Sequence, residues 1–285
     1  MLRSKTFKKF RLTRDPFAGD VARADDVYLT DDTRFAAEYL LQTAKAGGMV
    51  ALVGESGSGK TTLRRHAIDR MAAEGGKVRV IAPRCVDKTR LTTGSICDAI
   101  IADCSTEAPR RTLEAKARQV ERILTNSSRS GYSHVLMIEE AHDLGVRTLK
   151  YLKRFWEMED GFRKLLSIIL VGQVELKAML DESRNWDARE VIRRMEVLEI
   201  APLGTGADIA AYLDIKFGRL GKERRAIITD EGCEALAAKL RRQTRANVVY
   251  SVAFPLLVNN WTKRAMNSAA ELGASTVDAE IVNAL

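Results

Sequence analysis

Residues 49–61 read MVALVGESGSGKT, an apolar run followed at once by a glycine-rich turn. Gly54, Gly59, Lys60 and Thr61 fit the template G-x-x-x-x-G-K-[ST], in which backbone N–H groups surround the phosphates of a nucleotide. The lysine of such a loop reaches the outer phosphates, and the hydroxyl group binds magnesium. The sequence therefore predicts a site for ATP and Mg²⁺, with Thr61 as a metal ligand. The residues predicted to bind the nucleotide are Gly54, Glu55, Ser56, Gly57, Ser58, Gly59, Lys60, Thr61 and Thr62.

Short apolar runs alternate with helical patterns downstream of this loop, which is typical of an α/β fold with helices packed on a parallel sheet. A leading amphipathic helix precedes the first strand and ends at Gly47-Gly48. We expect strands at 49–53, 78–82, 134–138, 167–171 and 196–200. Further helices are expected at about 60–73, 92–102, 112–125, 147–158 and 174–181.

After Pro202 the strand patterns stop, and the remaining segments are predicted to be helices. These segments are 206–220, 229–243, 246–272 and a last one at about 276–284. The pattern predicts a small all-helical lid behind the α/β part. The expected domains are a basic N-terminal arm with its leading helix (1–48), an α/β ATPase core (49–203) and the lid (204–285).

Acidic and polar residues follow two of the predicted strands. In HVLMIEEAH, Glu139 stands where a magnesium-orienting acid is expected, and Glu140 can act as the general base on water. Gln173, after SIILVG, can hold that water or sense the γ-phosphate. The alternatives are an ordinary acidic strand end and a loop glutamine. Because carboxyl ends of parallel strands meet at one edge of a sheet, these residues are candidates for the catalytic site.

Two arginines, Arg193 and Arg194, precede the last predicted strand, EVLEI. A guanidinium presented at this place can reach the γ-phosphate of a neighbouring subunit as an arginine finger. The alternative is a solvated basic pair.

The net charge of +8 and a pI of about 9.4 favour an anionic partner such as nucleic acid, although a scattered basic surface that serves only solubility is the alternative. The first fourteen residues carry six cations and no acid, and this arm either touches such a partner or is solvated. No apolar stretch approaches the ~20 residues of a bilayer span, and no signal peptide is recognisable, so we expect a cytoplasmic protein without membrane contact. The four cysteines form no C-x-x-C pair and are expected to be apolar fillers; three histidines make a zinc site improbable.

With these motifs placed, the chain resembles the AAA+ ATPases. Within them it is similar to the branch that holds the phage Mu B protein, the TnsC target-selection ATPases of bacterial transposons and the ExeA secretion ATPases. The more specific features are FRLTRDPF, LVGQVEL and the segment from RRM to APL, and the resemblance spans roughly residues 7–285. It implies a five-stranded sheet of order 5-1-4-3-2 and ATP bound between adjacent subunits.

The resemblance also implies roles for individual residues. Glu139 departs from the aspartate usual at its position, which puts the metal geometry in question and is consistent with slow hydrolysis. The implied roles are Walker A for Lys60 and Thr61, Walker B for Glu139 and Glu140, sensor 1 for Gln173, the finger for Arg194, and sensor 2 for Arg245 at the start of a lid helix.

In ring or helical assemblies of this kind, two loops point to the central channel, here residues 84–95 and 104–118. Contacts from them would be to the DNA backbone and would carry little sequence information. The alternatives are solvated loop charges and a competing basic stretch, KYLKRFW at 150–156, whose Phe155 and Trp156 have the spacing of core residues. The residues implied to contact DNA are Lys88, Arg90, Thr92, Thr106, Arg110 and Arg111.

The sequence thus predicts an ATP-dependent regulator of DNA transposition that oligomerises, as a ring or helical filament, on duplex DNA. It would mark target DNA and stimulate a transposase, and ATP hydrolysis would disassemble it. The lack of a membrane span favours transposition over an ExeA-like secretion ATPase. That secretion ATPase and a replication initiator or helicase loader are the alternative functions.

Overall fold

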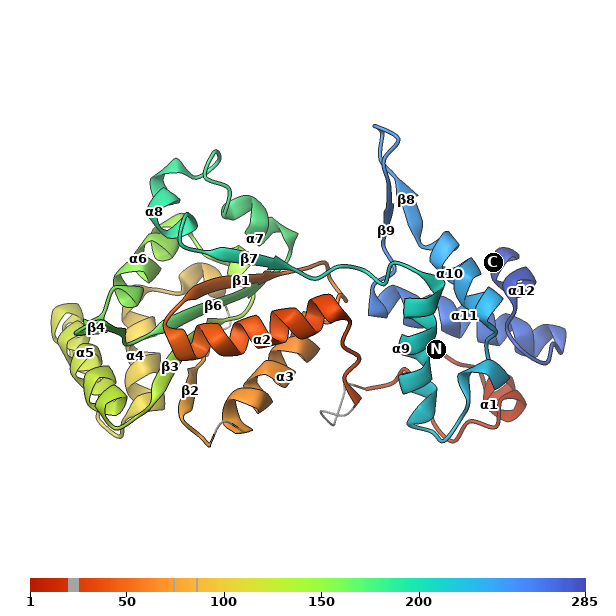
Figure 1. Cartoon of the computed structure of the whole chain (residues 1–285), viewed down its shortest axis with the longest axis horizontal. Coiled ribbons are helices and arrows are strands. Elements are labelled where there is room, and N and C mark those ends of the chain that lie inside the picture. The colour runs from red at the N-terminus through yellow and green to blue at the C-terminus, as the bar shows by residue number, and fades with distance from the viewer. Residues whose placement is uncertain (20–25, 74, 86) are drawn as a thin grey trace. The chain divides into compact units, whose positions relative to one another are not determined.

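The computed structural model describes residues 1–19, 26–73, 75–85 and 87–285, and these form two compact units (Figure 1). The sheet unit comprises residues 31–55 and 63–200. The terminal unit comprises residues 1–30, 56–62 and 201–285, so most of the predicted phosphate loop groups with it. Each unit is described by itself below. Within the described residues, none of the helices combines the length and the hydropathy needed to cross a membrane.

The sheet unit is built around five parallel strands with helices on both faces. Its strands are β1 (Met49–Val53), β2 (Val78–Ile81), β3 (Ser133–Ile138), β6 (Ser167–Gly172) and β7 (Glu196–Glu199), with a two-stranded hairpin of β4 (Glu159–Asp160) and β5 (Arg163–Lys164). Its helices are α2 (Asp31–Ala46), α3 (Lys60–Ala73, whose first three residues group with the terminal unit), α4 (Thr93–Cys104), α5 (Leu113–Arg129), α6 (Val146–Trp156), α7 (Val174–Met179) and α8 (Arg189–Ile192).

The strand order confirms the prediction. The sheet runs β2-β3-β6-β1-β7 with every neighbouring pair parallel, which is the expected order 5-1-4-3-2 read from the other edge. Val53 pairs with both Gly172 and Glu199, and Ile138 pairs with Leu170. The carboxyl ends of β1, β3 and β6 therefore lie at the same edge of the sheet.

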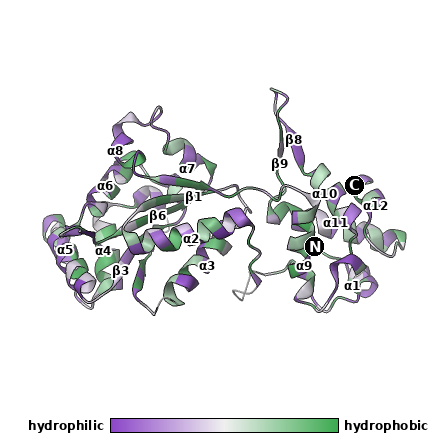
Figure 2. Cartoon of the chain, in the orientation of Figure 1, coloured by the Kyte–Doolittle hydropathy of each residue, from purple (hydrophilic) through white to green (hydrophobic). Residues whose placement is uncertain are grey.

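The central strands are buried on both faces, as their continuous apolar sequences require. One core cluster takes alternate residues of β1, Met49, Ala51 and Val53, and joins them to side chains from α4, α5 and α6. The intervening residues, Val50 and Leu52, are also fully buried, and α2 contacts β1, β3 and β6 (Figure 1). Hydrophobic colouring accordingly follows β1 and β6 in Figure 2. Helices pack on both faces of the sheet, so the residues at the carboxyl ends of its strands are held in fixed positions.

Three of the four cysteines are small core residues, as predicted. Cys97, Cys104 and Cys233 are buried, and burial raises the pKa of each thiol to about 11. These thiols stay protonated near neutral pH and are poor nucleophiles.

The terminal unit is mainly helical, but the prediction of an all-helical lid is wrong. Residues 241–251 form an antiparallel hairpin, and the helix expected from residue 246 begins only at Pro255. The elements of this unit are α1 (Ser4–Lys9), α9 (Gly206–Gly218), α10 (Asp230–Lys239), β8 (Arg241–Gln243), β9 (Val249–Ser251), α11 (Pro255–Leu272) and α12 (Ala279–Asn283).

Local chemistry explains the hairpin. The run from Val248 to Tyr250 is β-branched and aromatic, which favours a strand. Asn247 has a φ of 61°, in the left-handed region that asparagine tolerates, and closes a three-residue turn after Thr244. Pro255 then occupies the start of α11, where its missing N–H costs nothing.

The basic N-terminal arm is packed onto the terminal unit rather than projecting as a free arm. Phe10 and Phe17 are buried in its core, and the Phe17 ring meets the Phe217 ring edge to face at 5.7 Å. Arg3 pairs with Glu271, and Lys9 Nζ donates to the carbonyl of Gly273 at 2.9 Å. These cations lie at the carboxyl end of α11, where they complement the helix dipole. Part of the arm's charge therefore stabilises the fold. The two expected alternatives, contact with an anionic partner and solvation, did not include this role.

Candidate functional site

The glycine-rich loop has the backbone that a phosphate site requires. Gly57 and Gly59 have φ values of 77° and 98°, which side-chain-bearing residues rarely adopt. Ser58 is buried, and its Oγ has no hydrogen-bond partner within the described residues. A buried hydroxyl without a partner is costly unless a ligand satisfies it. α3 begins at Lys60, so the loop ends at a helix N-terminus, which favours an anion. The loop therefore fits a nucleotide phosphate.

Two acidic residues follow β3 at the carboxyl edge of the sheet. β3 is separated from β1 by β6 alone, and the amide of Gly54 donates to the carbonyl of Gly172 at 3.3 Å. Glu139 and Glu140 directly follow Ile138, the last residue of β3. Both carboxylates therefore follow β3, which is two strands away from β1, the strand that leads into the phosphate loop.

Glu140 has an unusual backbone conformation. Its φ of 51° and ψ of 38° lie in the left-handed region, which costs a non-glycine residue on the order of 1 kcal/mol. The side chain is 59% exposed, so it is accessible to water. Backbone strain of this kind clusters at functional sites, which agrees with the predicted role of Glu140.

The partner of Glu139 is an arginine that sequence reasoning missed. Nε of Arg64, on α3, lies 3.2 Å from Oε2 of Glu139, as an ion pair without hydrogen-bond alignment. The side chain of Arg64 is only 17% exposed, so this positive charge is held close to the acid. Its position one turn after Lys60 was the signal in the sequence, since residues i and i+4 share a helix face.

His142 joins two of the predicted catalytic residues. Its Nδ1 accepts the backbone N–H of Gln173 at 3.3 Å, and its Nε2 lies 3.3 Å from the Gln173 side-chain amide. The same Nε2 is 3.5 Å from Oε2 of Glu140. With Nδ1 as acceptor, a neutral ring carries its proton on Nε2, which then donates toward the carboxylate and does not accept from the Gln173 side-chain amide. The structure thus brings Glu140, His142 and Gln173 together. His142 is the last residue of VLMIEEAH, but its role becomes clear only from its contact with Gln173 in the folded chain.

The two predicted finger arginines differ in their surroundings. Arg193 Nε donates to Oε2 of Glu182 at 2.9 Å in a two-bonded pair, and this carboxylate raises the pKa of the guanidinium. Arg194 donates to the carbonyl oxygen of Glu190 at 2.5 Å and lies over the Trp156 ring at 5.7 Å. Within the described part of the chain, no carboxylate lies within ion-pair distance of Arg194. Arg194 is therefore the better of the two candidates for a trans contact.

Arg245 does not lie at the start of a lid helix, so that prediction is wrong. It occupies the exposed turn of the β8–β9 hairpin, ten residues before Pro255 begins α11. The positional reason for assigning it as sensor 2 is thereby removed.

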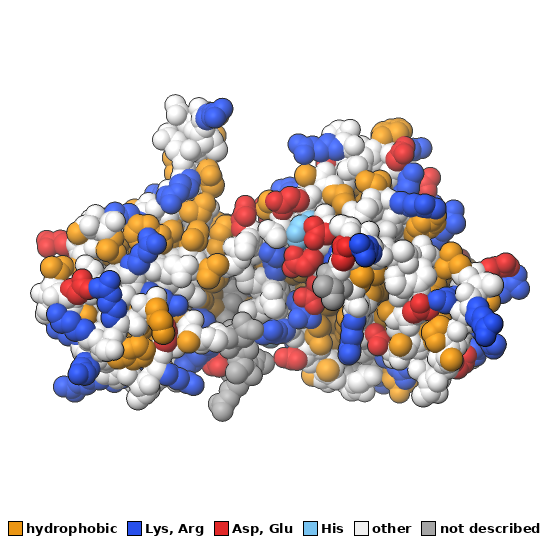
Figure 3. All heavy atoms as spheres, turned by 180° about the vertical axis from the view of Figure 1, so that it is seen from behind, with side chains coloured by type: hydrophobic (Ala, Val, Ile, Leu, Met, Phe, Trp, Pro, Cys, Tyr) orange, Lys and Arg blue, Asp and Glu red, His pale blue; other side chains and the backbone are white. Residues whose placement is uncertain are grey.

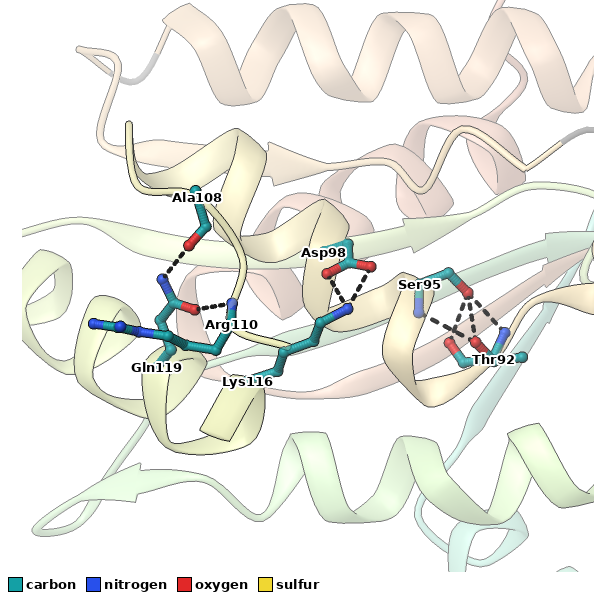
Figure 4. Close-up of polar contacts among 7 residues, drawn as sticks. All are labelled: Thr92, Ser95, Asp98, Ala108, Arg110, Lys116 and Gln119. Carbon is teal, nitrogen blue, oxygen red and sulfur yellow. Dashed lines mark hydrogen bonds and ion pairs between the residues drawn. The ribbon is translucent and has the colours of Figure 1, made fainter. Parts of the chain in front are cut away.

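The first predicted DNA-contacting loop uses most of its polar groups locally. Lys88 Nζ donates to the carbonyl of Pro83 at 3.1 Å, and Arg90 pairs with Asp87 at 3.1 Å. Thr92 caps α4 in a reciprocal capping box with Ser95, so its hydroxyl is already engaged (Figure 4). Val86 lies outside the described residues.

The second loop presents its cations more openly. Arg110 and Arg111 are exposed, as is Thr106. Gln119 on α5 holds the loop backbone by two hydrogen bonds. The amide of Arg110 donates to Oε1 of Gln119 at 3.0 Å, and Gln119 Nε2 donates to the carbonyl of Ala108 at 3.1 Å (Figure 4). A fixed backbone with exposed guanidinium groups suits contact with phosphates.

The two predicted loops flank α4, and the second folds back along that helix. Lys116, which belongs to the second range, pairs with Asp98 in the middle of α4 at 2.6 Å, three residues after Ser95 of the first range (Figure 4).

The competing basic stretch on α6 is largely neutralised. Together with α8 it lines a pocket of about 540 Å³, where Lys150 pairs with Asp187 at 3.5 Å and Lys153 pairs with Glu190 at 2.6 Å. Phe155 is buried in the core, as predicted. Trp156 packs against that core, and its Nε1 donates to the carbonyl of Gly47 at 2.6 Å. Phe155 and Trp156 are therefore not free for base stacking.

Comparison with known proteins agrees with this geometry. Residues 43–180 match the family model described as an AAA domain. The general secretion pathway protein A of Aeromonas hydrophila is 31% identical over 168 residues. That alignment covers 59% of this chain and 29% of the relative, so the chain matches less than a third of that protein's length.

Solved structures resemble the chain over nearly its whole length. The Aeropyrum pernix ORC2 protein, in ADPNP-ADP complexes, has a TM-score of 0.57 at 16% identity and covers 95% of this chain and 70% of its own. The Drosophila ORC bound to DNA has a TM-score of 0.59 at 13% identity and covers 99% of this chain and 65% of its own. At such identities the likeness concerns the fold. The fold is that of the AAA+ P-loop NTPases, and together the matches support an AAA+ ATPase.

Proposed function

We propose that this protein is an ATP-dependent, DNA-binding AAA+ regulator of DNA transposition, which assembles on duplex DNA as filaments and stimulates a transposase. The observation that carries the ATPase part is the shared sheet edge, where the phosphate loop follows β1, the two acids follow β3 and Gln173 follows β6. The transposition role rests on the resemblance of FRLTRDPF, LVGQVEL and the segment from RRM to APL.

In this proposal Lys60 binds the outer phosphates of ATP, while Thr61 and Glu139 hold magnesium. Bound magnesium supplies positive charge that offsets the charge of the phosphates. Glu140 accepts a proton from water as the water oxygen attacks the γ-phosphorus, and the bond to the bridging oxygen breaks to give ADP and phosphate. Gln173, held by His142, orients that water. The Arg64 charge beside Glu139 competes with the metal for the same carboxylate, which is a second reason to expect slow turnover.

Arg194 would complete the site of a neighbouring subunit, because its guanidinium is exposed and has no carboxylate partner among the described residues. Mixing Arg194→Ala subunits with Lys60→Ala subunits should then restore part of the ATPase activity that each lacks alone. Phosphate release across mixing ratios measures this, with mixed assemblies verified by sizing. A complete lack of recovery in mixed assemblies would exclude a finger that acts in trans.

The DNA part of the proposal rests on the basic charge of the chain and on the exposed pair Arg110 and Arg111. The Drosophila ORC, whose structure holds DNA, shows that the shared fold is compatible with this partner. The Arg110→Gln/Arg111→Gln variant should bind all duplex sequences more weakly. The slope of log affinity against log salt should fall by about 1 for each lost phosphate contact.

Fluorescence anisotropy with a labelled duplex, over a range of salt concentrations, measures both quantities. The matched control is Lys77→Gln/Lys222→Gln, which removes the same charge from other sites. An unchanged slope in the Arg110/Arg111 variant would move the DNA site elsewhere on the chain.

A secretion-linked ATPase is the second candidate, favoured by the 31% identity to the general secretion pathway protein A. Its partner would be a protein of the cell envelope rather than DNA. The anisotropy experiment separates the two functions, since a wild-type protein that binds no duplex DNA with ATP present would favour the secretion role.

A further inference from the structure

The β8–β9 hairpin is the most exposed element of the terminal unit. Every residue from 241 to 250 is exposed, and Figure 1 shows the hairpin projecting from the helices of its own unit. Its two strands pair over three positions, Arg241 with Ser251, Arg242 with Tyr250 and Gln243 with Val249. Because side chains alternate along a strand, Arg242 and Tyr250 share one face. Arg245 lies in the turn, at the far end of the hairpin.

The charge of the surrounding segment is strongly one-sided. Between Glu234 and Glu271 the sequence has six lysines and arginines and no acid. Three of these cations, Arg241, Arg242 and Arg245, lie in the hairpin. Among the residues that the structure describes, none of the three is within ion-pair distance of a carboxylate. In the sheet unit, by contrast, Arg90, Lys150 and Arg193 each pair with an acid.

The hairpin also exposes apolar surface that an isolated protein would normally bury. Val248, Val249 and Tyr250 are 59%, 58% and 48% exposed. A two-stranded hairpin without a packed face is marginally stable in water. In Figure 3 blue Lys and Arg side chains and orange hydrophobic side chains lie among the white atoms of the projecting hairpin. The combination of unpaired arginines with exposed apolar groups indicates a surface that is completed by an anionic partner.

We propose that the β8–β9 hairpin is a second contact element for duplex DNA, in addition to the predicted loops at 84–95 and 104–118. This inference rests on the proposed DNA-binding function. A two-stranded β-ribbon fits the major groove of B-DNA, whose width is about 12 Å. The three arginines contact phosphates on the groove walls, while Tyr250 and the valines contact sugars and base edges. Charge complementarity favours this occupant, because the sequence between Glu234 and Glu271 carries six lysines and arginines and no acid.

The test measures duplex binding by the full-length protein with a non-hydrolysable ATP analogue over a range of salt concentrations. The variant Arg241→Gln/Arg242→Gln should bind a labelled 60-base-pair duplex about tenfold more weakly or worse, and its salt slope should fall by about 2. Adding Arg245→Gln should lower the slope by about 1 more. Arg241→Lys/Arg242→Lys, which keeps the charge, should stay close to the wild type. Lys77→Gln/Lys222→Gln is the control for an equal loss of charge.

The possible outcomes separate this inference from the proposed function. If the wild type binds DNA and the Arg241/Arg242 variant binds with the same affinity and slope, the hairpin proposal is overturned while the proposed function stands. If the wild type binds no duplex DNA, both fail. If the variant keeps its DNA slope but loses nucleotide-dependent oligomers without DNA, the hairpin joins copies of the chain, and the proposal is overturned. Thermal unfolding and nucleotide binding at wild-type levels verify that each variant is folded.

Discussion

The Glu140→Gln variant should bind ATP and magnesium like the wild type but hydrolyse ATP about 10²–10⁴-fold more slowly. Glutamine keeps the size and shape of the side chain and removes the base. The Glu140 side chain is 59% exposed and lies beside His142 at the surface. Its replacement should therefore not disturb the core. Phosphate release under saturating ATP measures the rate, and a fluorescent ATP analogue measures binding.

Glu139→Gln is the matched control for this prediction. It removes one carboxylate of the same motif, but its proposed role is to hold the metal, so magnesium-dependent binding should weaken. It should also release Arg64 from its ion pair. If Glu140→Gln hydrolyses ATP at the wild-type rate, Glu140 is not the base, and His142 or a more distant acid must activate the water.

Lys60→Ala should lose nucleotide-dependent assembly. The proposed lysine contact with phosphate is a charge-assisted interaction of about 1.5–3 kcal/mol, so its removal should weaken ATP binding about 10- to 100-fold. Because ATP is proposed to join subunits, oligomers should then fail to form at ATP concentrations that saturate the wild type. Nucleotide binding and analytical sizing on duplex DNA measure both effects.

Lys77→Ala is the control, since it removes a lysine that is exposed and lies outside the loop. ATP-dependent oligomers of the Lys60→Ala protein at wild-type ATP concentrations would show that the phosphate-loop assignment is wrong.

The buried strands and the phosphate loop could be predicted closely from the sequence. MVALV was expected at 49–53, and β1 has the same bounds, because a strand buried on both faces is a continuous apolar run ended by glycine. The helix after the loop was likewise expected at 60–73, as observed. The strand order came from the resemblance to AAA+ ATPases, because no local pattern specifies which strands are neighbours.

Features that depend on tertiary contacts could not be predicted. His142 meets Gln173 only because β3 and β6 are adjacent, although 31 residues separate the two in the chain. The hairpin was mistaken for a helix because the long segment 246–272 was treated as one unit. Its first residues follow β propensity, and a proline within it begins the helix.

The central claim is that ATP binding holds the protein on DNA and that hydrolysis releases it. The most direct measurement is the lifetime of the protein on duplex DNA after free protein is washed away, with ATP and magnesium present, for the wild type and Glu140→Gln. The account predicts that the variant stays bound longer, by a factor that follows its loss of hydrolysis. A variant that no longer hydrolyses ATP yet leaves the DNA at the wild-type rate would contradict it.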